Sequence, residues 1–113
     1  MDINEYQNYV KEGSSPVYTK QLALIGLLGE VGEISDVIKK EAIYDDMSKF
    51  VDKYGMTVEE KIKDEASDVL WQYINLINQY NLSIQDVIDY NVEKLNKRHG
   101  GAGKMAKDGG GNR

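Results

Sequence analysis

The stretch LALIGLLGEVGEISDVIKK, residues 22–40, decides the fold that the sequence predicts. Its apolar residues recur at intervals of three and four, which is the spacing of one face of an α-helix. These residues are Leu24, Leu27, Leu28, Val31, Ile34 and Ile38. The pattern predicts a long helix from about Val17 to Ile43. No segment alternates between polar and apolar residues over a useful length, so an all-α fold is expected.

Further helices are predicted on both sides of this one. Thr57 followed by Glu60 is a capping-box signature, and it predicts the start of a second long helix that ends near Tyr80. Shorter helices are expected at residues 2–12 and 84–99. The two long helices carry apolar faces that are wider than one chain of this size can cover. We therefore expect a bundle of three to four helices with the long pair antiparallel, assembled as a homodimer or homotetramer.

The length of 113 residues predicts one domain. We assign residues 1–99 to it, with a loop at 44–56, and residues 100–113 to a flexible tail rich in glycine and lysine. The net charge of −5 argues against binding to a nucleic-acid polymer. The apolar runs are too short to span a membrane, and the absence of cysteine fits the reducing cytoplasm.

Two pairs of acidic residues share one spacing on the two long helices. Glu30 and Glu33 form an E-x-x-E pair on the first helix, and Glu65 and Asp68 form an E-x-x-D pair on the second. A helix advances about 100° per residue, so the position of each acid around the axis follows from its number. Glu30 and Glu65 fall at the border of the apolar faces. Both pairs therefore flank surface that we expect the fold to bury.

Carboxylates beside an apolar face are costly unless a positive charge compensates them. Lysines on the same helix would do so if these acids were ordinary surface residues. If the long helices pack antiparallel, the four side chains would instead form one cluster. Four converging carboxylates require a hard divalent cation, and ligands that are all oxygen suit Mg²⁺ or Mn²⁺.

The last predicted helix supplies groups of the opposite charge. Asn91, Lys94 and Arg98 lie along one edge of it, and an amide with two cations suits phosphate oxygens. Basic residues are also favourable near the C-terminus of any helix, where they complement the helix dipole. The phosphate-binding role is therefore expected only together with the carboxylate cluster.

Taken in order, these motifs resemble the MazG-like nucleoside triphosphate pyrophosphohydrolases, which are all-α enzymes. The resemblance covers roughly residues 17–99 and rests on EVGE at 30–33, EASD at 65–68 and NVEK at 91–94 with Arg98. It implies a hydrolase that cleaves a nucleoside or deoxynucleoside triphosphate between the α- and β-phosphates. The products would be the monophosphate and pyrophosphate. The segment between the two acid pairs is slightly longer than the family usually shows.

The resemblance also implies a role for each motif residue. The residues expected to hold Mg²⁺ are Glu30, Glu33, Glu65 and Asp68. Either Glu30 or Glu33 would act as the general base on the attacking water. The residues expected to bind the substrate phosphates are Asn91, Lys94 and Arg98, which a neighbouring subunit could supply.

Other functions remain open at this point. A dUTPase-like enzyme and a phosphoribosyl-ATP pyrophosphohydrolase share the fold and similar acid pairs, and a helical interaction module without catalysis would need no metal. Trp71 is a candidate for contact with the nucleotide base. Its position opposite the apolar face of its helix, however, favours burial against a second subunit.

Overall fold

The computed structural model describes residues 1–43 and 55–100, so most of the predicted loop and tail lies outside the described residues. The described part contains no strand and four helices, which are α1 (Ile3–Gly13), α2 (Lys20–Ile43), α3 (Val58–Gln79) and α4 (Ile84–His99). The prediction of an all-α fold with two long helices is confirmed.

The caps read from the sequence set the ends of α3 and α4. The Thr57 side chain accepts a hydrogen bond from the backbone N–H of Glu60, and the Ser83 side chain accepts one from that of Asp86. These bonds satisfy amide groups that the first turn of a helix leaves unpaired. At the other end of α4, Gly100 has a φ of 73°, a left-handed conformation that favours glycine and ends the helix.

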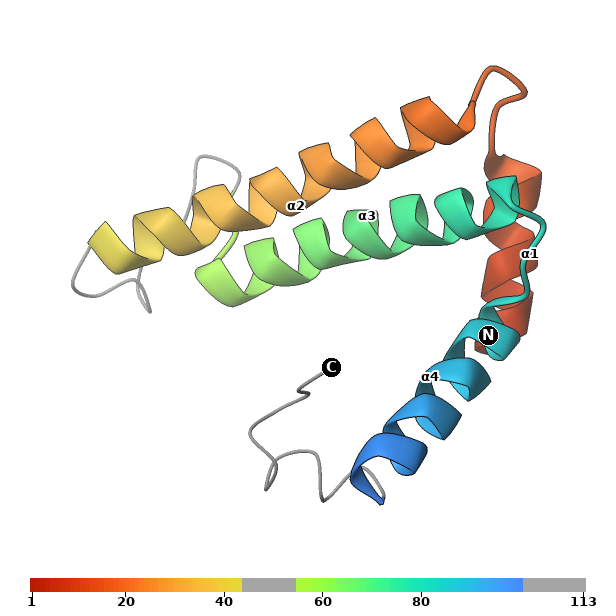
Figure 1. The fold of residues 1–113 in the computed structure, drawn as a ribbon. Helices are drawn as coiled ribbons and strands as arrows, with labels where there is room; N and C mark the ends of the chain where they lie inside the picture. The colour runs from red at the N-terminus through yellow and green to blue at the C-terminus, as the bar shows by residue number, and fades with distance from the viewer. Residues whose placement is uncertain (44–54, 101–113) are drawn as a thin grey trace.

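The two long helices α2 and α3 lie side by side and antiparallel, as Figure 1 shows. Ala23 of α2 is fully buried. Gly26 lies against the Gln72 side chain of α3, because a Cβ atom at Gly26 would stand 2.7 Å from the Oε1 atom of Gln72. Glycine at this position therefore lets the two helices approach closely. The pair forms a hairpin that carries both acidic motifs.

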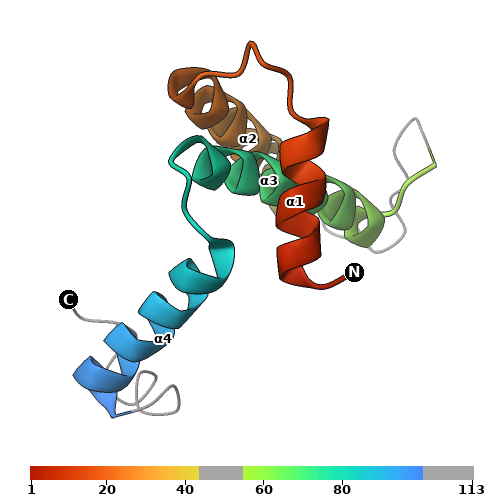
Figure 2. The ribbon, with the colours of Figure 1, turned by 90° about the vertical axis from the view of Figure 1, so that its right-hand side faces the viewer.

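The apolar core lies where α1 crosses one end of this hairpin (Figures 1 and 2). Val10 of α1, Ile74 of α3 and Ile84 of α4 are buried and form one cluster. Partly buried side chains surround it, namely Ile3, Tyr6, Trp71, Tyr73 and Val87. The first helix therefore joins the hairpin to α4.

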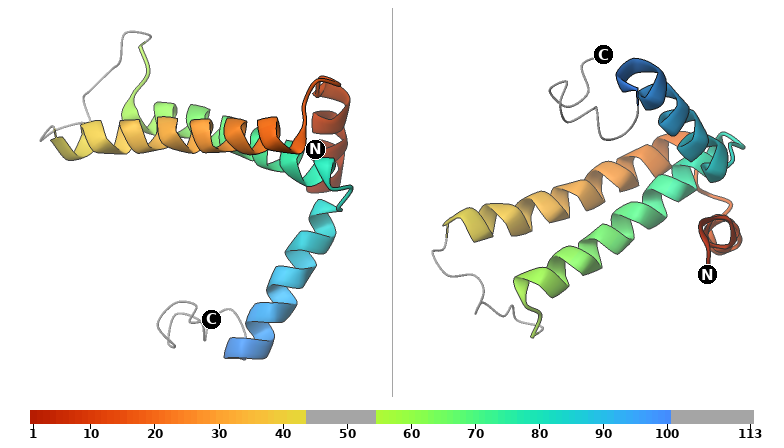
Figure 3. Two further views of the ribbon diagram at one scale, coloured as in Figure 1. Left: turned by 45° about the horizontal axis from the view of Figure 1, so that its top comes forward. Right: turned by 90° about the horizontal axis from the view of Figure 1, so that it is seen from below.

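Gln7 of α1 fixes the place where α4 begins. Its Nε2 atom donates hydrogen bonds to Oδ1 of Asn78 and to the carbonyl oxygen of Leu82, both at 2.8 Å. Its Oε1 atom accepts a hydrogen bond of 2.9 Å from the backbone N–H of Ile84. Asn81 turns the chain between α3 and α4 with a φ of 55°. From this turn α4 points away from the hairpin, as Figure 3 shows.

A wide apolar surface of α2 is left uncovered by the chain itself. Seven large hydrophobic residues of this helix are 46–64% exposed, and they are Leu22, Leu24, Ile25, Leu28, Val31, Ile38 and Ile43. The expectation that one chain cannot cover its apolar faces is thus confirmed for α2, whereas the oligomeric state stays a prediction. Despite this surface, none of the helices in the described residues is long and apolar enough to cross a bilayer.

Candidate metal centre

Three of the four predicted carboxylates meet between the long helices. Glu30 of α2 and the pair Glu65 and Asp68 of α3 each offer one oxygen atom, and these oxygens lie within 4.8 Å of one another. Glu30 is far from Glu65 and Asp68 in the sequence, and the antiparallel packing of α2 against α3 brings it to them. The structure therefore brings together three of the four acids that were expected to converge, namely Glu30, Glu65 and Asp68, and the metal-binding role of this group stays a prediction.

The three carboxylates differ in their exposure to solvent. Glu65 is 6% exposed, Glu30 is half-buried and Asp68 is exposed, so the cluster is closed on one side and open on the other. Burial raises the pKa of the Glu30 carboxyl above its ordinary value. Neighbouring negative charges raise this pKa further, and they belong to Asp68, Glu65, Glu33 and Asp64, in that order. The cluster thus resists the ionisation of Glu30.

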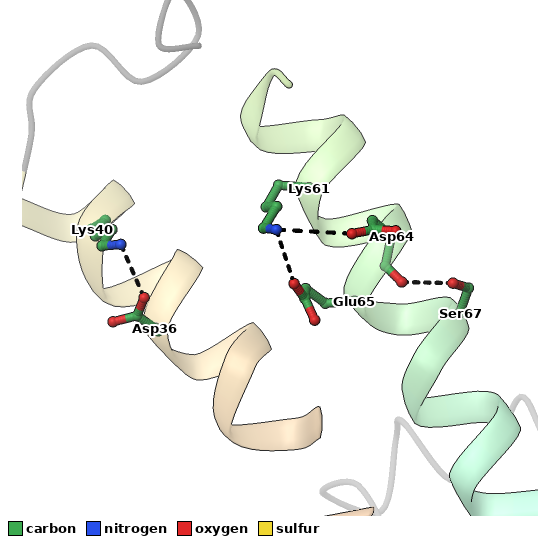
Figure 4. Close-up of polar contacts among 6 residues, drawn as sticks. All are labelled: Asp36, Lys40, Lys61, Asp64, Glu65 and Ser67. Carbon is green, nitrogen blue, oxygen red and sulfur yellow. Dashed lines mark hydrogen bonds and ion pairs between the residues drawn. The ribbon is translucent and has the colours of Figure 1, made fainter. Parts of the chain in front are cut away.

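Among the residues that the structure describes, Lys61 is a cation that contacts this cluster. Its Nζ atom lies 3.1 Å from Oε1 of Glu65 and 3.8 Å from Oδ2 of Asp64. Figure 4 shows the side chains of Lys61 and Glu65 on the side of α3 that faces α2. The contact with Glu65 was missed in the sequence, although the i, i+4 spacing of Lys61 and Glu65 is a sufficient signal for it.

A second ion pair, on α2, shows what an ordinary surface acid does in this chain. Lys40 contacts Asp36 at 3.0 Å, one helical turn away, and both side chains are more than half exposed (Figure 4). Such exposed pairs contribute little to stability. Glu65 differs because its carboxylate is almost fully buried beside two other acids.

Glu33 lies outside the group of three carboxylates. Its side chain is exposed, and it follows Glu30 by almost one turn on α2. Its charge still reaches the cluster, because it contributes to the raised pKa of Glu30. Its role as a ligand or as a base stays a prediction.

The three predicted phosphate-binding residues lie on α4, apart from the carboxylates of the same chain (Figures 1 and 3). Asn91 and Arg98 are exposed, and Lys94 is half-buried with its Nζ atom 6.0 Å from the centre of the Tyr90 ring. A shallow pocket of about 310 Å³ is lined by Tyr90, Glu93, Lys94, Lys97 and Arg98. The basic groups are thus gathered on one helix, but within one chain they do not join the acidic cluster.

Trp71 packs inside its own chain rather than on a free face of α3. It is partly buried against the core cluster, and its ring is 6.1 Å from that of Tyr18 in a tilted arrangement. Part of the side chain is therefore buried without a second subunit, and burial of the rest against a second subunit stays a prediction. Contact between Trp71 and a nucleotide base stays a prediction.

The donor atoms of the cluster fit a hard divalent cation. All of them are carboxylate oxygens, which Mg²⁺ and Mn²⁺ prefer over nitrogen or sulfur. Oxygens around one Mg²⁺ ion stand about 3–4 Å apart when each lies about 2.1 Å from the metal. The side chains would need only a small contraction from the spacing seen here. The open side at Asp68 leaves room for water or for a substrate oxygen.

Comparison with known proteins gives matches that include the helices of this site. Residues 18–101 match the family model described as the MazG nucleotide pyrophosphohydrolase domain. The chain is also 34% identical over 77 residues to the gene 37 protein of Mycobacterium phage L5. This match covers 66% of the chain and 60% of the phage protein, so the chain spans less than two thirds of that relative. No solved structure gives a significant match.

Proposed function

The chain belongs to the MazG nucleotide pyrophosphohydrolase family, and from this premise we propose that it hydrolyses nucleoside or deoxynucleoside triphosphates between the α- and β-phosphates. The products would be the nucleoside monophosphate and pyrophosphate. The observation that carries the proposal is the meeting of Glu30, Glu65 and Asp68 between two antiparallel helices. A surface role would not require a buried carboxylate such as Glu65 at this position.

We propose that the carboxylates hold Mg²⁺, with Mn²⁺ as a substitute. Glu30, Glu65 and Asp68 would bind it directly, and Glu33 could turn toward it from the neighbouring turn of α2. When bound, the ion supplies positive charge to the phosphate oxygens and lowers the pKa of a coordinated water. The acidic cluster would otherwise repel a triphosphate, so the cation is what lets this site accept its substrate.

The remaining carboxylate is our choice for the general base. Glu33 lies outside the group of three and is exposed, so it can accept a proton from the attacking water without giving up a place in the cluster. Glu30 suits this role less well, because its half-buried carboxylate is one of the three that converge. The proton would pass to the Glu33 carboxylate as the water oxygen attacks phosphorus.

The phosphates need cations as well, and we propose that a second copy of the chain supplies them. Lys94 and Arg98 lie on a helix that points away from the hairpin, while the apolar surface of α2 is uncovered. A homodimer or homotetramer could cover that surface and bring α4 of one copy to the carboxylates of another. Arg98 and Lys94 would then neutralise the leaving pyrophosphate. Nucleotide pools of this kind are found in the cytoplasm, where we place the enzyme.

The proposal is tested with a panel of ribo- and deoxyribonucleoside triphosphates together with phosphoribosyl-ATP, in the presence of Mg²⁺. We expect release of pyrophosphate and the monophosphate, and loss of this release in Glu65→Gln and Asp68→Asn. A matched control is Glu59→Gln, which removes an exposed acid from the first turn of the same helix.

The other possible results have distinct meanings. Release of single phosphate groups would refute cleavage between the α- and β-phosphates. Hydrolysis of dUTP alone would identify a dUTPase, and hydrolysis of phosphoribosyl-ATP alone would identify the histidine-pathway type of enzyme. No hydrolysis of any of these compounds would favour a helical interaction module.

A further inference from the structure

Lys61 is placed where a cation is needed when no metal is bound. Its Nζ atom lies 3.1 Å from Oε1 of Glu65, and Glu65 is the most buried of the three clustered carboxylates. A buried carboxylate beside two other acids is costly unless a positive charge compensates it. The ammonium group of Lys61 provides that charge from within the same helix. It therefore does for the metal-free cluster part of what a bound metal ion would do.

The same contact must oppose metal binding. A divalent cation held by Glu65 would stand beside the Lys61 ammonium group, and like charges at such short range repel strongly where water is partly excluded. Lys61 would have to leave Glu65 for the metal to bind well. Its side chain is 27% exposed, so it is not locked inside the protein and has space toward solvent.

A second acid is already in place to receive it. Asp64 is the neighbouring residue on α3, its side chain is 44% exposed, and its Oδ2 atom is 3.8 Å from the Lys61 Nζ atom. A small rotation of the lysine side chain would shorten this contact and lengthen the one to Glu65. Asp64 is not one of the three clustered carboxylates, so it can hold Lys61 while the cluster holds a metal.

We propose that Lys61 is a built-in counter-ion that competes with the divalent cation for Glu65 and moves to Asp64 when the cation binds. This rests on the proposed metal site, and it adds a residue that sets the affinity of that site. The lysine would keep the metal-free protein folded and would weaken metal binding at the same time. The affinity for metal is thereby set below the value that the carboxylates alone would give.

The test measures Mn²⁺ binding to the full-length protein without substrate, by electron paramagnetic resonance of the free ion. We expect Lys61→Met to bind Mn²⁺ about three- to tenfold more tightly, since the competing ion pair is gone. Its melting temperature in EDTA should be lower than that of the unchanged protein. Lys61→Arg keeps the charge and should keep the original affinity. Lys63→Met, an exposed lysine of the same helix, should change neither quantity.

A second variant separates the transfer to Asp64 from simple competition. Asp64→Asn leaves Glu65 and Lys61 in place but removes the charge that receives the lysine, so it should weaken Mn²⁺ binding about two- to fivefold. The Asp64 charge also acts directly on the cluster. The same substitution is therefore measured in Lys61→Met, where no lysine is transferred and the loss of affinity should be smaller. Unchanged or weaker binding in Lys61→Met would overturn the proposal, as would the absence of Mn²⁺ binding in the unchanged protein. Unchanged binding in Asp64→Asn would overturn the transfer. These readouts need no turnover, so they stand apart from failure of the proposed hydrolysis.

Discussion

The substitution Glu30→Gln is predicted to stabilise the protein without metal and to abolish its response to metal. The side chain keeps its size and loses only its charge. One oxygen of Glu30 lies within 4.8 Å of one from Asp68 and one from Glu65, so the glutamine removes two repulsive pairs. The raised pKa of Glu30 reflects the same repulsion together with burial.

The size of the effect follows from Coulomb's law. Two unit charges 4.8 Å apart repel by about 0.9 kcal/mol in bulk water and by about 3.5 kcal/mol at the effective dielectric constant of about 20 that suits protein surfaces. Because Asp68 is exposed and Lys61 offsets the charge of Glu65, values near the lower limit apply. We expect the free energy of unfolding without metal to rise by about 1–2 kcal/mol. For a domain of this size the melting temperature should rise by roughly 3–8 °C.

The assay is thermal unfolding followed by circular dichroism, at one protein concentration, in EDTA and in saturating Mg²⁺. The unchanged protein should melt at a higher temperature with Mg²⁺, because a ligand that binds only the folded state stabilises it. The melting temperature of Glu30→Gln should be higher than that of the unchanged protein in EDTA and should rise little or not at all when Mg²⁺ is added. Glu41→Gln, which removes an exposed acid near the end of the same helix, should keep the full response. A lower melting temperature of Glu30→Gln in EDTA, or an unchanged Mg²⁺ response, would refute the reasoning.

Three further predictions concern acidity, α4 and assembly. The raised pKa of Glu30 means that the folded, metal-free protein holds the Glu30 proton more tightly than the unfolded chain does. The contribution of Glu30 to the free energy of unfolding should therefore improve as the pH falls through that pKa and worsen above it. Urea unfolding in EDTA at several pH values would show this. Gln7→Ala removes three hydrogen bonds at the start of α4 and should lower the free energy of unfolding by about 2–3 kcal/mol. The control is Gln85→Ala, whose side chain bonds only within α4, and it should cost less than about 0.5 kcal/mol. Leu28→Glu places a charge on the uncovered face of α2, where the leucine is 61% exposed. Sedimentation should then show monomers, and hydrolysis should be lost. An unchanged oligomer would contradict the proposed interface.

Much of the fold could be predicted because its helices are defined by local signals. Thr57 and Ser83 mark the starts of α3 and α4 by capping, and the apolar period identifies α2. Helices that follow one another in a bundle commonly pack antiparallel, and α2 and α3 do so. The meeting of Glu30 with Glu65 follows from that packing, which is why this part of the site was predictable.

The parts that could not be predicted depend on contacts between segments far apart in the sequence. The direction of α4 depends on Gln7, which lies more than seventy residues away from its partners at Asn78 and Ile84. The partial burial of Trp71 depends on the core cluster and on Tyr18, which is more than fifty residues away in the sequence. Helical periodicity describes each helix on its own, so it cannot predict either contact.

The position of α1 has a consequence for how this protein should be divided. The family match begins at residue 18, after α1 has ended. Yet Val10 is fully buried against Ile74 and Ile84, and Gln7 holds the first turn of α4. A fragment cut at the start of the matched segment would keep the clustered carboxylates and lose the side chains that close the core. The segment that matches the family is thus shorter than the unit that folds. Sequence similarity leaves α1 out, although α1 contributes a buried side chain to the core.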